Sequence, residues 1–525
     1  MSTRRSPGEE PQARSEIGAR APQDAGEQTT RIVDGSGGGA HTSIAEAVAA
    51  AAPGEVVIVR PGRYDEALVV DKPLEIVGDG DRGEVVIEVA GADALVFTGT
   101  MGRLSNLTIR QAGGGDFFGV DIAHGRLDVD DCEITSKGLA CITVRDGADP
   151  RIRRTSVHGG RQAGILIVGA LGTLVENDVH GNAMAGIEIR DGADPTLRRN
   201  RVHDGGGSGV LVDNARGIVE DNDISGNVRA GIEISGGADP TLRRNRVHDG
   251  GGSGIFVHDG ARGTLEDNEV WGNGLAGIEI ADGADPVLRR NRIHDGRAGG
   301  VFVHTDGRGT LEENDIAANV FSGVSIKGGG NPVMRRNRIH HGRASGVFIY
   351  EGGRGMLEEN DVFANAFSGI SIKDSGDPVV RRNRVHDGIE SGVFVYKDGR
   401  GTLEENEIFG NGGAGVEIKE GSDPTFRRNR IYDGRSAGVF VHSTGRGTLE
   451  ENEISSNAGA GVSIGDGGSP TLRRNRINFN NHEAVSVHAG GAGVIEDNDL
   501  SDNIRGAFEI APAAEAAVTR VGNRE

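Results

Sequence analysis

The chain has 525 residues, of which 88 are glycine and only 4% are aromatic, a composition that argues against a globular core built on bulky side chains. No apolar run approaches the ~18 residues that a transmembrane helix needs, and the N-terminal residues lack the apolar segment of a secretory signal peptide. The 57 Lys and Arg against 78 Asp and Glu give a net charge of −21, which disfavours general binding to nucleic acid. We therefore expect a soluble, cytoplasmic protein with neither a nucleic-acid nor a membrane partner.

The N-terminal part of the chain divides into two predicted segments. Residues 1–30 are polar, charged and rich in Pro and Gly, and we expect a disordered tail. Residues 31–110 are predicted to form an N-terminal cap followed by irregular first coils. Within them, Ser43 and Glu46 form a capping box ahead of an alanine-rich stretch that stops at Pro53. This short helix is predicted to cover the open first coil, as terminal repeats must.

Residues 111–510 form one long repeat. Asparagine returns every 23 residues, with a single step of 22, and each unit holds three short apolar alternations separated by Gly, Asn, Asp and Pro. Helical repeats need about 33 residues or more, whereas a coil of three short strands fits in one such unit. We therefore predict an all-β fold, a parallel β-helix solenoid with three strands per coil. Residues 511–525 are expected to be a C-terminal tail or cap.

The repeated asparagines are predicted to build a corner of every coil. Between the inward Leu265 and the inward Val270 the alternation breaks, so the chain must turn sharply near Asn268. Asparagine tolerates the left-handed conformation and bonds along a stack of its own kind. We expect Asn268 to build the corner in this way, within a stack of asparagines along the rod.

The charges next to each asparagine alternate in sign from coil to coil. Arg289, Arg290 and Arg292 follow a coil that carries Glu266, Asp267 and Glu269 at the same positions. Opposite charges at cross-strand distance attract by about 0.2–1 kcal/mol per pair, and a slip by one coil reverses the sign of every pair. The pattern is predicted to fix the register of the coils.

An exposed aromatic stripe is the strongest candidate for a binding site. With Ile255 and Val257 pointing inward, Phe256 points outward, and its counterparts recur every 46 residues. Contiguous apolar surface rimmed by polar groups usually marks a contact site. The predicted ligand-binding residues are Phe256, Phe302, Phe348, Phe394 and Phe440, with His258, His304, Tyr350, Tyr396 and His442 two positions on and Lys327, Lys373 and Lys419 on the coils between.

A second outward column carries histidine and larger aromatic residues. It is predicted to be a packing ladder, with binding as the alternative. Its members are His158, His203, His248, Trp271, His294, His340, Phe363, His386, Phe409 and Tyr432.

Neither a metal nor a cofactor is predicted. Cys132 and Cys141 lack metal-ligand spacing and are expected to be small buried thiols. The acidic residues lie in ladders opposite arginine, so no carboxylate cluster stands out as a calcium site.

The recurring pattern Asn-x-Ile-x-x-Asn-x-x-x-Gly-[Ile/Val]-x-Ile, as in Asn222–Ile234, resembles the right-handed parallel β-helix repeat family. The segments Val56–Tyr64 and Lys72–Gly78 are similar to the start of pectinesterase-like and pectin-lyase-like chains. The resemblance implies a right-handed solenoid and a carbohydrate-related superfamily that includes lyases, esterases, hydrolases and epimerases. It also includes non-catalytic repeats, such as those of F-box β-helix proteins, and fold does not select among these.

The catalytic signatures of the enzymatic relatives are absent. Only Asp116–Gly119 approaches the pectinesterase segment, one residue short and without its partner pair, and no Asp-Pro is followed by the epimerase's His-Asp. The remaining catalytic candidates are Tyr350, Tyr396 and Lys373, because neighbouring ammonium groups favour a phenolate base. Cation–aromatic stacking explains the same residues without catalysis.

We therefore predict a binding or scaffold protein that holds an extended polymer, either a polysaccharide or a protein segment, along the aromatic stripe. The first alternative is a polysaccharide lyase, epimerase or hydrolase acting on that face. The second is a structural rod that self-associates through the same stripe.

Overall fold

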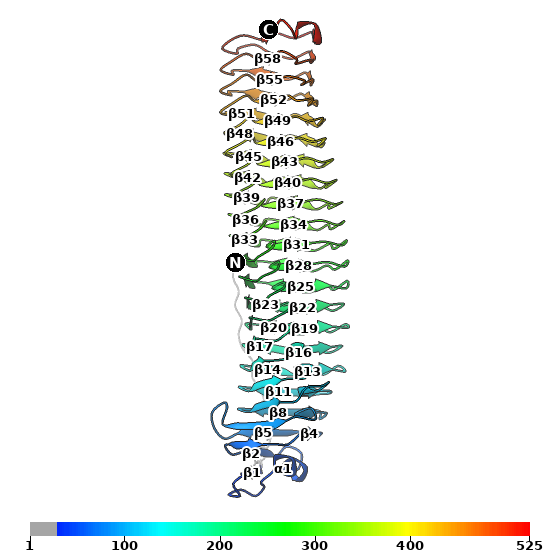
Figure 1. Cartoon of the computed structure of the whole chain (residues 1–525), viewed down its shortest axis with the longest axis vertical. Coiled ribbons are helices and arrows are strands. Elements are labelled where there is room, and N and C mark those ends of the chain that lie inside the picture. The colour runs from blue at the N-terminus through cyan, green and yellow to red at the C-terminus, as the bar shows by residue number, and fades with distance from the viewer. Residues whose placement is uncertain (1–28) are drawn as a thin grey trace, which may run out of the picture.

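The computed structural model describes residues 29–525, which wind into a long rod of stacked coils (Figure 1). In these residues the strands form three sheets that run along the rod, which we call A, B and C. Sheet A has 22 strands, sheet B has 19 and sheet C has 20, and every pairing between neighbouring coils is parallel. The prediction of an all-β parallel solenoid is confirmed. The predicted tail falls almost wholly outside the described residues.

A central coil shows how the repeat makes its core. It contributes β29 (Thr264–Glu266) to sheet A, β30 (Glu269–Trp271) to sheet B and β31 (Ile278–Ile280) to sheet C. The inward side chains of these strands are fully buried, and each stacks on the equivalent residue of the next coil, as Leu265 does on Leu288. Because the short strands alternate inward and outward side chains, the core is a column of small aliphatic residues and the functional surface lies on the outward positions.

The first coil is covered by helix α1 (Ile44–Ala50), as predicted (Figure 1). The Ser43 hydroxyl accepts a hydrogen bond from the Glu46 backbone N–H. A second cap comes from Glu66, whose carboxylate accepts hydrogen bonds from the backbone N–H groups of Ile44 and Ala45 at 2.7 and 3.0 Å. The helix contacts three strands of the first coils, namely β1 (Thr30–Val33), β2 (Val56–Val59) and β4 (Leu68–Val70).

The asparagine ladder is present, but its corner differs from the prediction. The Asn268 Oδ1 accepts hydrogen bonds from the backbone N–H and the side-chain amide of Asn245, both at 3.0 Å, and its own amide donates to the Asn291 Oδ1 at 2.9 Å. The left-handed residue is Asp267, with φ 55°, and not Asn268. The amide must point inward to join the ladder, so the preceding residue, whose side chain points to solvent, takes the left-handed position at a cost of roughly 1–2 kcal/mol.

Arginines contact carboxylates of adjacent coils beside this ladder. The Arg290 Nε lies 2.9 Å from the Asp267 carboxylate, and the Arg289 guanidinium lies 2.9 Å from the Glu312 carboxylate on the opposite side. The predicted alternation of charge is therefore realised as ion pairs between coils. Because these side chains are partly exposed, each pair contributes little by itself, and their number gives the register its specificity.

The last residues continue the solenoid. Strand β60 (Phe508–Ile510) adds to sheet C, a 3-10 helix spans Glu515–Ala517, and β61 (Val518–Val521) pairs with β59 (Gly493–Glu496) of sheet A. Within residues 29–525, none of the helices has the length and apolar character needed to cross a bilayer.

Candidate binding groove

Sheet C carries the predicted aromatic stripe on its outer face. Ile255 and Val257 are fully buried, whereas Phe256 between them is only half-buried, so the predicted facing is confirmed. Each phenylalanine ring packs against the ring two positions on. We call these five ring pairs the aromatic face: Phe256–His258 (centroids 4.2 Å apart), Phe302–His304 (4.4 Å), Phe348–Tyr350 (4.5 Å), Phe394–Tyr396 (4.3 Å) and Phe440–His442 (4.2 Å).

The ring pairs occur on every second strand of sheet C. The strands that carry them are β28 (Ile255–Val257), β34 (Val301–Val303), β40 (Val347–Ile349), β46 (Val393–Val395) and β52 (Val439–Val441). The strands between them are β31, β37 (Val324–Ile326), β43 (Ile370–Ile372) and β49 (Val416–Ile418), and β25 (Ile232–Ser235) precedes the first of them. Neighbouring strands lie about 4.8 Å apart, so the ring pairs repeat every ~9.6 Å.

The three predicted lysines lie among the rings. The Lys373 Nζ is 5.4 Å from the Phe348 ring centroid and 5.7 Å from that of Tyr350, while the Lys419 Nζ is 5.1 Å from the Phe394 ring. The Lys327 Nζ lies 5.7 Å from the Tyr350 ring. Each ammonium also forms an ion pair with a partly exposed carboxylate, so the lysines contribute cation–aromatic contacts more than net charge: Lys327–Glu351 at 3.4 Å, Lys373–Asp374 at 3.0 Å and Lys419–Glu420 at 3.6 Å.

A second wall faces the aromatic face, and the sequence reasoning missed it. In several coils, the loop that joins sheet B to sheet C carries a large apolar side chain that is half or more exposed. We call these side chains the loop lip: Met184 (52% exposed), Leu275 (55%), Phe321 (61%) and Phe367 (50%). The sequence does hold a signal for the loop lip: Leu275, Phe321 and Phe367 are spaced 46 residues apart, as are the phenylalanines of the aromatic face.

Three adjoining hollows form a groove between the loop lip and sheet C. Their volumes are about 190, 450 and 300 Å³. The first two share Arg229 and Glu233, and the last two share Leu275 and Glu279, so the groove is continuous. Of the predicted ligand-binding residues, Phe256, Phe302 and Tyr350 line these hollows; the others lie on or beside the same face.

The floor of the groove is acidic, a feature that the sequence reasoning also missed. Glu233 lines the first two hollows, and its carboxylate accepts hydrogen bonds from the Ser208 hydroxyl and from the His258 Nε2 at 3.4 Å. The His258 hydrogen bond lowers the pKa of the Glu233 carboxyl, and the same contact raises the pKa of His258. Burial raises the pKa of Glu188, which lines the first hollow.

Glu279 repeats this arrangement two coils further on. Its carboxylate accepts hydrogen bonds from the Ser253 hydroxyl and from the His304 Nε2, the latter at 3.1 Å. Burial alone would raise the pKa of Glu279, but these hydrogen bonds outweigh burial and the pKa is lowered. In the central coils Ser325 and Ser371 replace the glutamates, opposite Phe302, Phe348 and Phe394 in the strand register.

The surroundings of the three catalytic candidates do not favour a phenolate. Burial raises the pKa of Tyr350 and of Tyr396, and the neighbouring lysines only partly oppose this effect. A hydrogen bond to Asp374 raises the pKa of Lys373. At neutral pH both tyrosines are therefore phenols and Lys373 is an ammonium, so none of them is a ready general base.

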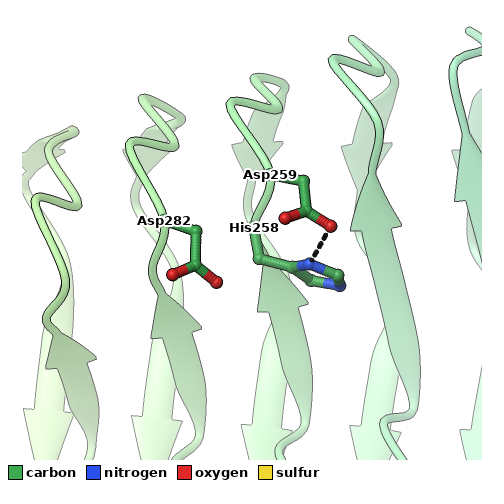
Figure 2. A group of neighbouring side chains, drawn as sticks. All are labelled: His258, Asp259 and Asp282. Atoms are coloured by element: carbon green, nitrogen blue, oxygen red, sulfur yellow. Dashed lines mark hydrogen bonds and ion pairs between the residues drawn. The ribbon is translucent and has the colours of Figure 1, made fainter.

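In residues 29–525 a single cluster offers three metal-ligating side chains. His258, Asp259 and Asp282 lie at the end of two adjacent strands of sheet C, with ligand atoms all within 4.8 Å of one another (Figure 2). The His258 Nδ1 lies 2.9 Å from the Asp259 carboxylate. Both carboxylates are exposed, and none of the three residues lines the hollows of the groove.

The second predicted stripe lies on the outer face of sheet B, where its rings stack on one another. Trp271 stacks on His248 with ring centroids 4.1 Å apart, and His386 stacks on Phe409 at 4.6 Å. The Arg246 guanidinium covers the Trp271 ring at 5.3 Å. The predicted packing ladder is therefore confirmed, because these rings stack on one another.

Comparison with known proteins agrees with this architecture. The family model described as "Right handed beta helix region" matches residues 93–239, 140–291, 195–319, 276–411 and 389–519. A search of curated proteins gave no match.

Among solved structures, pectin methylesterase from Aspergillus niger is 14% identical, with a TM-score of 0.35 over 45% of this chain and 89% of that one. Alginate lyase from Paenibacillus sp. is 17% identical, with a TM-score of 0.33 over 49% and 93%. A periplasmic alginate epimerase is 13% identical, with a TM-score of 0.33 over 68% and 75%. Because the family matches cover most of the repeat region without a gap, this chain belongs to the right-handed β-helix family.

Proposed function

We propose that this protein binds an extended polysaccharide along the groove between the loop lip and the aromatic face. The observation that carries the proposal is the continuity of three hollows lined by phenylalanine rings, apolar loop side chains and half-buried carboxylates. Sugar rings present apolar C–H faces and hydroxyl groups, which match aromatic walls and carboxylate acceptors respectively.

An extended protein segment fits the groove less well. A peptide strand binds a sheet by adding main-chain hydrogen bonds at a free edge. The strands that floor the groove are paired on both sides, as β31 is with β28 and with β34. A peptide lying across them would leave its own N–H and C=O groups without backbone partners, whereas sugar hydroxyls bond to side chains such as Glu233 and Ser325.

The charge of the floor also bears on the type of polysaccharide. Glu188, Glu233 and Glu279 line the hollows, against the single cation Arg229. The whole chain carries a net charge of −21. A strongly anionic polymer is repelled by both, so we favour a polysaccharide without acidic sugars.

A screen of soluble oligosaccharides and extended peptides, followed by calorimetry, tests the proposal. The groove spans the eight sheet C strands from β19 (Ile187–Arg190) to β40, about 34 Å at ~4.8 Å per strand. We expect affinity for a matching oligosaccharide to rise with chain length until the ligand spans that distance. Binding of peptides alone, or concentration-dependent self-association without sugar binding, would overturn the proposal.

A further inference from the structure

Two half-buried carboxylates in the groove lack the arginine partner that carboxylates on sheet A have. On sheet A, Glu312 and Asp267 face arginines of adjacent coils. Within residues 29–525, Glu233 and Glu279 have no arginine or lysine nitrogen within ion-pair distance, and their ion-pair contacts are His258 and His304 alone. Neither carboxylate is therefore held in an ion pair with arginine or lysine, and each is hydrogen-bonded to a histidine and a serine hydroxyl.

These two carboxylates flank an aromatic ring in one hollow. Glu233 and Glu279 both line the 450 Å³ hollow, and Phe256 lies between them in the strand register. The apolar side chains of Val228 and Leu275 complete the lining. Carboxylates beside an aromatic ring, partly shielded from water, are the groups that recognise an ammonium cation.

The surrounding charges reinforce this preference. Asp259 and Asp282 lie beside His258 at the end of its strand (Figure 2), and neither has an arginine or lysine within ion-pair distance in the described part of the chain. Arg229 is the one cation in the lining of the hollow. The lining of this hollow thus holds two carboxylates against one guanidinium.

We propose that the hollow between Glu233 and Glu279 selects an amino sugar whose free amine is present as an ammonium group. This inference rests on the proposed function and adds the chemical class of the ligand. The two carboxylates stand on strands two coils apart, about 9.6 Å, so sugars spaced along one extended chain reach both. Ser325 and Ser371 replace the glutamates in the central coils, which confines the preference to the glutamate-bearing part of the groove.

Three oligosaccharides of equal length test the inference: a polymer of free amino sugars, its N-acetylated form and an unsubstituted glucan. Calorimetry is done at a pH at which the amine is protonated. We expect the wild-type protein to bind the amino form at least tenfold more tightly than the N-acetylated form, with an advantage that shrinks as salt is raised. The double variant Glu233→Gln/Glu279→Gln should lose this advantage, and Glu405→Gln, which faces Arg428 on sheet A, should keep it.

The outcomes separate this inference from the proposed function. Equal affinity of the wild-type protein for the amino and N-acetylated forms overturns the inference and leaves polysaccharide binding intact. A full amino preference in the double variant, with an unchanged circular dichroism spectrum, also overturns it. If none of the three saccharides binds the wild-type protein, the proposed function and the inference fail together.

Discussion

The ring of Phe394 stacks on the ring of Tyr396, with centroids 4.3 Å apart and planes 13° from parallel. Residues i and i+2 of a strand lie on the same face, so the pair is made within one strand and does not depend on a neighbouring coil. Stacking holds each phenylalanine ring in place as part of the aromatic face. A rigid wall loses little conformational freedom when a ligand binds, which favours affinity.

The alternating charges predict what happens when one coil is reversed. The triple variant Arg289→Glu/Arg290→Glu/Arg292→Glu places like charges against Glu266, Asp267 and other carboxylates of both neighbouring coils. We expect local opening of these coils, seen as faster backbone hydrogen exchange over residues 265–320. A triple Arg→Lys variant keeps the sign and should keep the protection. Unchanged exchange in the glutamate variant would show that the charges do not set the register.

The buried asparagine ladder predicts that removing a single side-chain amide lowers the stability of the protein clearly. The Asn314 Oδ1 accepts hydrogen bonds from the backbone and side chain of Asn291, both at 3.0 Å, and its amide donates to the Leu288 carbonyl at 3.0 Å. Asn314→Ala leaves the buried backbone N–H of Asn291 without its partner, at about 1–3 kcal/mol, and removes further hydrogen bonds of the ladder. We expect a clear fall in the urea midpoint, whereas Asn481→Ala, at an exposed position, should change it little. Equal midpoints for the two variants would contradict the role of the ladder.

The fold and the aromatic face were predictable because they depend on local alternation. A residue between two inward aliphatic side chains must face outward, as Phe256 does, and a 23-residue period fixes which residues stack. The loop lip and the acidic floor depend on how loops of different coils lie against sheet C, and short-range patterns do not report that. The left-handed position of Asp267 was missed because the amide of Asn268 has to point inward.

The two cysteines are predicted to be unreactive toward thiol reagents in the folded protein. Cys132 and Cys141 are fully buried, and burial raises the pKa of each thiol to about 12. The thiolate is the reactive form, so a water-soluble thiol reagent should label neither residue at neutral or mildly alkaline pH. Both should react after denaturation. Rapid labelling of the native protein would show that these coils open easily.

The protein is predicted not to process uronic-acid polymers. The phenols of Tyr350 and Tyr396 have raised pKa values, so neither can abstract a sugar proton readily at neutral pH. Incubation with such polymers should yield no unsaturated chain ends and no change in sugar configuration. Turnover that disappears in Tyr350→Phe or Tyr396→Phe would instead support a lyase or epimerase acting on this face.

The most direct test of the groove is to remove its phenylalanine wall without touching the core. The triple variant Phe256→Ser/Phe302→Ser/Phe348→Ser alters half-buried outward positions on strands within the groove, so the far-ultraviolet circular dichroism spectrum should be unchanged. Calorimetry with an oligosaccharide that binds the wild-type protein should show affinity at least tenfold weaker, about 1.4 kcal/mol. The matched variant Phe363→Ser/Phe409→Ser, on sheet B, should bind normally. A folded triple variant that binds as tightly as the wild-type protein would contradict the assignment of the groove.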